Sequence, residues 1–197
     1  MTVQDGDNVW GERCELGLNE SYAPNTLYHE GQRRVTFISI RLGGGVNPMG
    51  ADWRTVMQMK QAQTYRNPDM SPIIEVQVRD GEWVLRNSWN DLWSAPATAN
   101  KWTRFALDIT YSQDPEVGSM RMYVDLNGDG DSSDSGESSP EMHMATLRAE
   151  TAGSGSSRYD VGESIPDHLR AGIYQNEDYS CPAGCSVDVD NVQVVKG

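Results

Sequence analysis

The sequence predicts an all-β fold, an antiparallel β-sandwich of the jelly-roll type. Apolar and polar residues alternate with period two in many short segments, as they do in half-buried strands. The 19 glycines and nine prolines supply frequent turns between these segments. Long windows do not show the periodicity of an amphipathic helix. Many short strands separated by turns are typical of two packed antiparallel sheets.

Each expected strand is a short alternating segment bounded by turn residues. Segment 35–42 is rich in β-branched residues and stops at three consecutive glycines. Segments 73–78 and 82–86 are joined by Arg79-Asp80-Gly81, which indicates a hairpin. The other expected strands are 13–16, 55–60, 104–110, 120–125, 168–174 and 187–194.

Two polar stretches, 128–140 and 153–157, are expected to be loops. Strands on both sides of each loop are needed to complete the sheets, so we expect one domain over residues 1–197. A chain of 197 residues is long enough to bury its own hydrophobic core.

The chain is acidic, with 29 acidic against 16 basic residues and a formal net charge of -13. This argues against broad nucleic-acid binding, which needs basic side chains to replace phosphate counterions. No apolar run approaches the ~20 residues of a membrane-spanning helix, so we expect no membrane partner. We expect a soluble protein that is a monomer.

The three cysteines provide information on the redox compartment in which the protein is found. Cys181 and Cys185 flank Pro-Ala-Gly, a turn-prone segment that could bring them together as a disulfide. The alternatives are free thiols or, less favoured, a metal site. Cys14 is expected to be a small buried residue. A disulfide would indicate an oxidising compartment, so we expect a secreted protein. The first seven residues lack the basic and apolar regions of a signal peptide, so we expect that its signal peptide has been removed.

Polar side chains of an unusual kind fall on one face of three expected strands. Alternate residues of a strand share a face, opposite an apolar set. An ordinary solvated sheet face is the simplest explanation. These positions, however, hold mainly cations and neutral hydrogen-bond donors, which in an acidic chain suit an anionic ligand. They are Arg13 and Glu15, then Gln58 and Lys60, then His168, Arg170, Gly172 and Tyr174.

These segments resemble a known family. Arg13-Cys-Glu-Leu16, Gln58-Met-Lys60 and His168-Leu-Arg-Ala-Gly-Ile-Tyr-Gln-Asn176 are similar, in the same order, to three signature segments of the jelly-roll alginate lyases. Those segments read Arg-(Ser/Thr)-Glu-Leu-Arg, Gln-Ile-His and Tyr-Phe-Lys-Ala-Gly-Val-Tyr-Asn-Gln. The wider chain looks closer to the related glucuronan lyases and heparin-lyase-like proteins. The resemblance implies a concanavalin A-like jelly roll and β-elimination on a uronate polysaccharide.

The resemblance implies a role in β-elimination for each matched residue. The C5 proton of a uronate is weakly acidic, so the charge that develops when it leaves must be stabilised around the carboxylate. By resemblance, Gln58 and Arg13 hold that carboxylate. Tyr174 removes the C5 proton and could also protonate the departing oxygen. Further substrate contacts are expected from Lys60, Arg170, His168 and Glu15.

One departure from the family pattern concerns histidine. This chain has Lys60 where the alginate lyases have the histidine of Gln-Ile-His, and lysine is a poor base at neutral pH. The glucuronan lyases use a histidine from an earlier strand. His29 is the corresponding candidate catalytic residue here; the alternative is a histidine on a surface loop.

A calcium site is expected in the loop that begins at Asp125. Asp125, Asn127, Asp129 and Asp131 place oxygen donors at alternating positions, as in the first part of an EF-hand loop. The final position of that pattern is a glycine instead of glutamate, so an acidic solvated loop is the alternative. Calcium would be structural, and no organic cofactor is expected.

The favoured function is therefore a polysaccharide lyase that cleaves a uronate chain, with β-1,4-linked glucuronan preferred and alginate next. The alternative is a lectin-like carbohydrate-binding module on the same fold. A glycoside hydrolase is disfavoured, because the sequence lacks a Glu-x-Asp-x-x-Glu-like arrangement of the jelly-roll glucanases.

Overall fold

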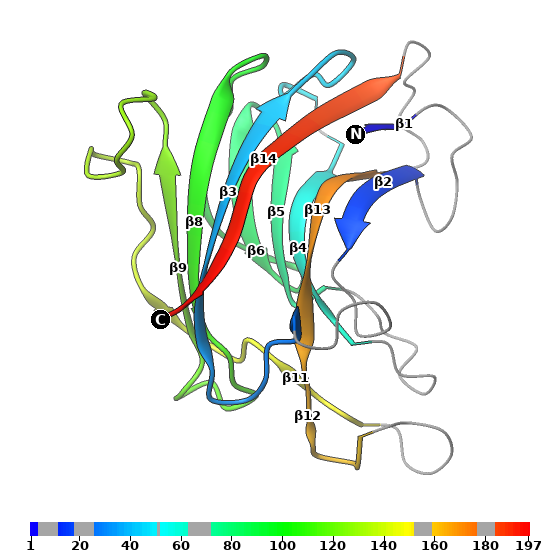
Figure 1. The fold of residues 1–197 in the computed structure, drawn as a ribbon, viewed down its shortest axis with the longest axis vertical. Coiled ribbons are helices and arrows are strands. Elements are labelled where there is room, and N and C mark those ends of the chain that lie inside the picture. The colour runs from blue at the N-terminus through cyan, green and yellow to red at the C-terminus, as the bar shows by residue number, and fades with distance from the viewer. Residues whose placement is uncertain (4–11, 18–25, 51, 63–71, 152–158, 177–183) are drawn as a thin grey trace.

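The computed structural model describes the chain except for residues 4–11, 18–25, 51, 63–71, 152–158 and 177–183. The described residues form no α-helix, and their strands build two antiparallel sheets that pack face to face (Figure 1). The all-β prediction is therefore confirmed. A helix long and apolar enough to cross a membrane does not occur among the described residues.

The first sheet has six strands. In spatial order they are β1 (Thr2–Val3), β14 (Cys185–Lys196), β3 (Arg33–Leu42), β8 (Trp102–Thr110), β9 (Ser119–Asp125) and β10 (Met142–His143).

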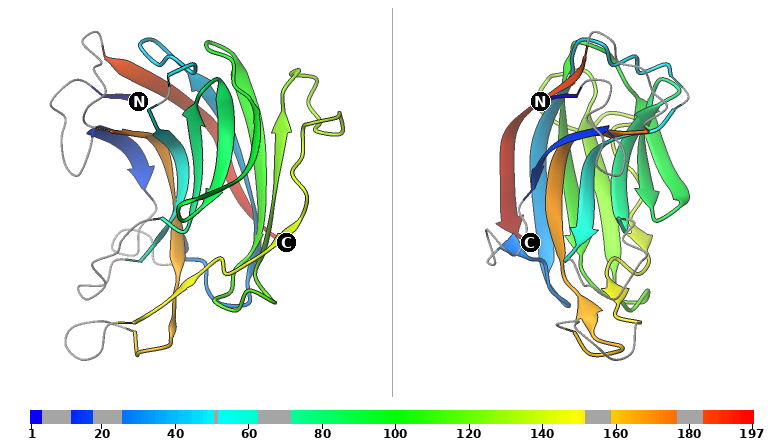
Figure 2. Two further views of the ribbon diagram at one scale, coloured as in Figure 1. Left: turned by 180° about the vertical axis from the view of Figure 1, so that it is seen from behind. Right: turned by 90° about the vertical axis from the view of Figure 1, so that its right-hand side faces the viewer.

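The second sheet also has six strands and carries the predicted site. In spatial order they are β2 (Glu12–Gly17), β13 (Asp167–Gln175), β4 (Arg54–Gln61), β5 (Ile74–Arg79), β6 (Glu82–Asn87) and β7 (Asn90–Pro96). A short pair, β11 (Arg148–Ala149) and β12 (Ser164–Ile165), lies at one end of the sandwich (Figure 2).

The core lies between the two sheets, where alternate apolar side chains from each sheet meet. In β8, Phe105, Leu107 and Ile109 are buried, and in β13, Leu169 and Ile173 are buried. The rings of Phe105 and Trp83 meet edge to face, with centroids 5.1 Å apart. Because one face of β13 packs into this core, the residues between its core positions project to the outer face of the second sheet.

The predicted strands are all present, and the hairpin is confirmed as a two-residue turn. Asp80 and Gly81 both have positive φ, 52° and 80°, which such a tight turn requires. The prediction missed β7, whose residues Asn-Asp-Leu-Trp-Ser-Ala-Pro alternate poorly. This strand lies at the edge of the second sheet, where a proline is tolerated.

One of the two predicted loops lies within the described residues and can be compared with the structure. Residues 128–140 contain no strand, as expected. Loop 153–157 lies outside the described residues.

The cysteines follow the prediction in part. Cys185 forms a disulfide, so the free-thiol alternative is wrong for this residue. Its expected partner, Cys181, lies outside the described residues. Cys14 is a free thiol that is half-buried against the core.

Candidate active site

Three predicted segments lie side by side in the second sheet, because β13 pairs with β2 on one side and with β4 on the other. Directly paired residues share a face of a sheet. The register makes the pairs Tyr174–Arg13, Arg170–Gln58 and His168–Lys60. We name the polar residues that these strands place on the outer face the β13 cluster: Arg13, Glu15, Gln58, Lys60, His168, Arg170 and Tyr174.

A glycine allows β2 to approach β13 closely at this cluster. A Cβ atom on Gly172 would lie 2.2 Å from the carbonyl oxygen of Cys14, so any side chain there would push β2 away. The pairing of β13 with β4 is irregular between Ala171 and Tyr174. Such irregularities bend a strand and change the direction of nearby side chains.

Glu15 connects β2 to the other two strands. The Nε2 group of Gln58 donates a hydrogen bond to Oε1 of Glu15. The Arg170 guanidinium lies 3.8 Å from Oε2 of the same carboxylate. Nε of Arg170 donates to Nε2 of His168 at 3.2 Å. One hydrogen bond and one ion pair to Glu15 therefore connect the three strands across the face.

Tyr174 is held between a cation and an aromatic ring. The Arg13 guanidinium lies over the Tyr174 ring, 4.2 Å from its centroid. Trp53 meets the same ring edge-on, with centroids 4.9 Å apart. These contacts restrict the position of the phenol, as a residue that transfers a proton requires.

The cluster is not a solvated sheet face. Gln58 and His168 are each only 2% exposed, and the other members of the cluster are half-buried. The ordinary solvated face considered from the sequence is therefore wrong. Buried polar groups gain strength from the low local dielectric, which suits a binding or catalytic site.

Burial and neighbouring cations shift the acid–base properties of the cluster. Burial, with Arg170 and then Arg13, lowers the pKa of Lys60 to about 8. Burial, with Arg170 and Lys60, lowers the pKa of His168 to about 4, so its imidazole is neutral at neutral pH. Burial raises the pKa of Tyr174, and the Arg13 cation opposes this rise. The resting tyrosine is therefore a neutral phenol.

Sequence reasoning missed Glu75, which extends the polar face onto β5. Glu75 lies directly opposite Gln58 and is 7% exposed. Burial raises its pKa to about 7, and the nearby Arg86 opposes the rise. The alternation of 73–78 places Glu75 and Gln77 on the same face of the strand, so the sequence indicates that the two side chains lie together. It does not indicate that β5 lies next to β4, which brings Glu75 beside the cluster.

His29 is not joined to the cluster. It lies exposed in the turn before β3, and its backbone N–H donates to the side-chain oxygen of Gln32 at 3.2 Å. Among the described residues, no hydrogen bond, ion pair or ring contact connects the His29 side chain with the β13 cluster. Its catalytic role stays a prediction.

The Asp125 loop is held by its own hydrogen bonds. The Asp125 carboxylate accepts the backbone N–H groups of Gly128 at 2.5 Å and Gly130 at 3.0 Å. The Glu137 carboxylate accepts the N–H of Leu126 at 2.7 Å. Across the described part of the chain, no group of three or more His, Cys, Asp or Glu residues is arranged to hold a metal ion. Calcium binding by Asp125, Asn127, Asp129 and Asp131 stays a prediction.

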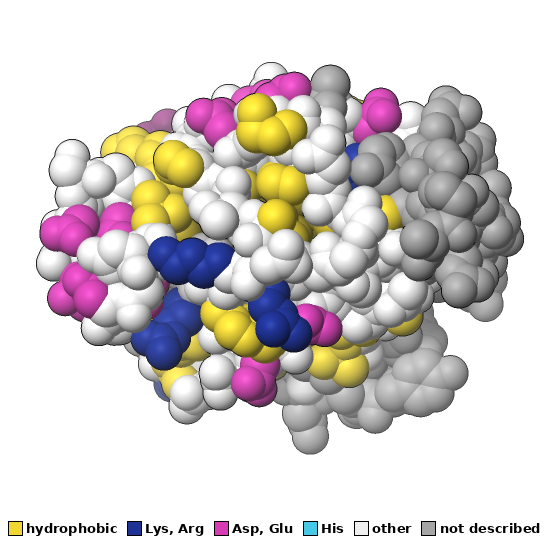
Figure 3. Space-filling view, turned by 90° about the horizontal axis from the view of Figure 1, so that it is seen from above, with side chains coloured by type: hydrophobic (Ala, Val, Ile, Leu, Met, Phe, Trp, Pro, Cys, Tyr) yellow, Lys and Arg dark blue, Asp and Glu magenta, His cyan; other side chains and the backbone are white. Residues whose placement is uncertain are grey.

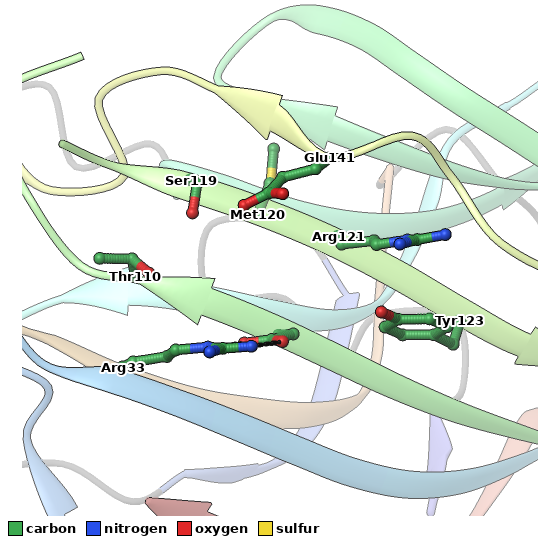
Figure 4. Close-up of a pocket in the computed structure, with 8 residues that line it drawn as sticks. Arg33, Thr110, Ser119, Met120, Arg121, Tyr123 and Glu141 are labelled. Atoms are coloured by element: carbon green, nitrogen blue, oxygen red, sulfur yellow. Dashed lines mark hydrogen bonds and ion pairs between the residues drawn. The ribbon is translucent and has the colours of Figure 1, made fainter. Parts of the chain in front are cut away.

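The outer face of the first sheet has a different character. A hollow of about 300 Å³ lies there, and Figure 4 shows its residues projecting from β3, β8 and β9. Its arginines are occupied: Arg33 donates to both carboxylate oxygens of Asp108, at 2.9 and 2.6 Å, and Arg121 lies over the Tyr123 ring. This hollow contains no residue of the β13 cluster.

The acidic excess of the chain is distributed unevenly. On the end of the sandwich shown in Figure 3, basic side chains lie beside apolar ones, and acidic side chains lie both next to them and at the margin.

Comparison with known families decides between the enzymes and binding proteins that share this fold. The family described as polysaccharide lyase matches residues 1–191. The chain belongs to this family. The predicted membership of the polysaccharide lyases is thus confirmed, and a purely carbohydrate-binding module is disfavoured. A comparison with curated proteins finds no match.

Solved structures similar to this lyase show how widely the fold is shared. An endo-β-1,4-glucuronan lyase from the fungus Trichoderma reesei has a TM-score of 0.66 and 15% identity over 98% of this chain and 79% of that one. An alginate lyase from Aplysia kurodai has a TM-score of 0.54 and 9% identity over 86% and 71%. A glycoside hydrolase family 131 catalytic domain from Coprinopsis cinerea has a TM-score of 0.51 and 13% identity over 100% and 69%. At these identities the likeness establishes the fold alone.

Proposed function

We propose that this lyase cleaves a uronate polysaccharide by β-elimination at the β13 cluster, with a β-1,4-linked glucuronan-type chain as the favoured substrate class and alginate next. The observation that carries the proposal is the meeting of Arg13, Gln58 and Tyr174 on one face of adjacent strands. The names of the similar structures, a glucuronan lyase and alginate lyases, support the choice of substrate.

The cations of the cluster would hold the uronate carboxylate. Arg13 and Lys60 add positive charge around the site, and the second N–H of the Gln58 amide is available beside the one that Glu15 accepts. Neutralising the carboxylate lowers the energy of the carbanion-like state that forms when C5 loses its proton.

Tyr174 would carry out the proton transfers. The resting phenol first releases its proton to water. The phenolate then takes the proton from C5, and the C–H electron pair forms the double bond between C4 and C5. The bond from C4 to the glycosidic oxygen breaks, and the phenol gives the proton it has taken to that oxygen. The Arg13 cation over the ring favours the phenolate that accepts the C5 proton. No water is added, which distinguishes this reaction from hydrolysis.

The disulfide at Cys185 supports an oxidising compartment for the protein, because stable disulfides are rare in the cytosol. We therefore propose that the lyase is secreted and acts on polysaccharide outside the cell.

A panel of uronate polysaccharides tests the proposal. Incubation with glucuronan, alginate and heparin-like chains should produce the ultraviolet absorbance of an unsaturated uronate. Tyr174→Phe should lower kcat by about 10²-fold to 10⁴-fold and leave polysaccharide binding unchanged, because the ring and its packing remain while the proton carrier is lost. Absence of the absorbance on every polymer, or full activity of Tyr174→Phe, would contradict the assignment.

A further inference from the structure

The outer face of the first sheet carries two aromatic side chains in one row. Phe37 on β3 pairs with Ala106 on β8, and Ala106 pairs with Tyr123 on β9. Thr36 and Ile38 are buried in the core, so Phe37 between them projects outward, where it is 41% exposed. Directly paired residues share a face of a sheet, so all three project to the same side. We name Phe37, Ala106 and Tyr123 the aromatic row.

The spacing of the aromatic row fits a polysaccharide. Two strand spacings, ~10 Å, separate Phe37 from Tyr123. This is close to the length of a disaccharide unit in a β-1,4-linked chain, in which alternate sugars present the same ring face. Ala106 carries only a methyl group, so a chain can lie across the surface between the two rings. Aromatic rings pack against the apolar C–H face of a sugar, and each ring of the row is placed to hold one sugar.

Arg121 fixes the Tyr123 ring in place. The Arg121 guanidinium lies over this ring, 4.9 Å from its centroid. Its Nε donates to the carbonyl oxygen of Ser139 at 3.0 Å, and its Nη2 donates to Oγ of Ser138 at 3.3 Å. Ser138 also forms an antiparallel bridge with Tyr123 itself. A ring that is already oriented loses little conformational entropy when a ligand packs against it.

The hollow of about 300 Å³ on this face supplies hydrogen-bonding groups beside the row. Tyr123 forms part of its lining, and Asp108, Thr110 and Glu141 contribute side-chain oxygens to it (Figure 4). The hollow holds two arginines and two acidic residues, so its formal charges balance. One of these arginines, Arg33, donates to both oxygens of Asp108. This surface therefore suits the hydroxyl groups of uncharged sugars more than the carboxylates of a uronate.

We propose that the aromatic row is a second, non-catalytic site that binds a β-1,4-linked chain of uncharged sugars. The row lies on the first sheet and the β13 cluster on the second, so a chain held at the row leaves the cluster accessible. Such a site would keep the lyase attached to a polysaccharide matrix while the second sheet cleaves a uronate chain. The binding does not depend on the proposed function, because no residue of the β13 cluster takes part in it.

Isothermal titration calorimetry of the full chain with cellohexaose, a soluble β-1,4-linked chain of six glucose units, tests the proposal. The wild type should bind the oligosaccharide, and Phe37→Ala should weaken binding about tenfold because one stacked ring is lost. Ala106→Arg should abolish binding, because its side chain fills the space between the two rings. This variant keeps both rings, and its new side chain extends from the outer face, so it also serves if Phe37→Ala fails to fold.

Trp102→Ala is the matched control. Trp102 is 39% exposed and belongs to β8 like Ala106, but it lies at the start of that strand, over Arg41. Trp102→Ala should bind cellohexaose as the wild type does. The inference is overturned if the wild type does not bind cellohexaose, if Phe37→Ala or Ala106→Arg binds it equally well, or if Trp102→Ala weakens binding as much as Phe37→Ala. None of these results changes the ultraviolet assay on uronate polysaccharides, whose failure would remove the proposed function and leave the aromatic row untouched.

Discussion

Lys60→Arg tests how the β13 cluster uses its positive charge. The proposed mechanism needs Lys60 as a cation, and burial with Arg170 and Arg13 lowers its pKa to about 8. About nine-tenths of the Lys60 side chains are then charged at pH 7, and about one-tenth at pH 9. An arginine stays charged over this range. The ratio of kcat/KM for Lys60→Arg to that of the wild type should therefore rise about tenfold from pH 7 to pH 9.

The ratio isolates Lys60 because Tyr174 titrates in both proteins. Initial rates follow the absorbance of the unsaturated product on a substrate that the wild type cleaves. Lys60→Met serves as the control without charge and should be slower than the wild type at pH 7. A ratio that stays constant would show that the charge is not needed. A ratio that falls with pH would show that the neutral amine is the active form, and either result refutes the assignment.

Three further predictions concern stability. Trp83→Ala removes a fully buried ring and should lower the free energy of unfolding by about 3–5 kcal/mol in urea denaturation. Burial raises the pKa of Asp167, so the native state loses stability as pH rises above the ordinary aspartate pKa. Asp167→Asn should therefore raise Tm at pH 7 and not at pH 4. Equal changes in Tm at the two pH values would contradict this prediction. If the Asp125 loop binds calcium, the ion at 100 times its Kd should raise the free energy of unfolding by about 2.7 kcal/mol, and Asp129→Asn should abolish that gain.

Local sequence patterns were sufficient to predict most of the strands and the face of the sheet on which each site residue lies. Period-two alternation in 168–174 separates Leu169 and Ile173, which are buried in the core, from Arg170 and Tyr174 on the outer face. This works because strand geometry ties side-chain direction to residue parity. The hairpin at Asp80-Gly81 was predictable for a similar local reason, since few residues adopt positive φ readily.

Non-local relations could not be predicted from the same patterns. The pairing of Glu75 with Gln58 and Arg86 depends on strand order, which no single segment encodes. The burial of Gln58 and His168 depends on what packs around them, and alternation alone does not indicate whether an outer face is covered. Edge strand β7 was missed because an edge tolerates weak alternation and a terminal proline.

The pairing of Lys60 with His168 gives a physical reason for the departure from the alginate-lyase pattern. That pattern has histidine at the Lys60 position and tyrosine at the His168 position, and the register here places the two residues directly opposite each other. The same surroundings that hold His168 neutral, with a pKa of about 4, leave Lys60 mostly charged at neutral pH, because its pKa falls only to about 8. A histidine buried beside Arg170 would lose its charge in the same way. Lysine therefore keeps a cation where histidine would not, and under the proposed mechanism we expect Lys60 to neutralise the substrate carboxylate and not to transfer a proton.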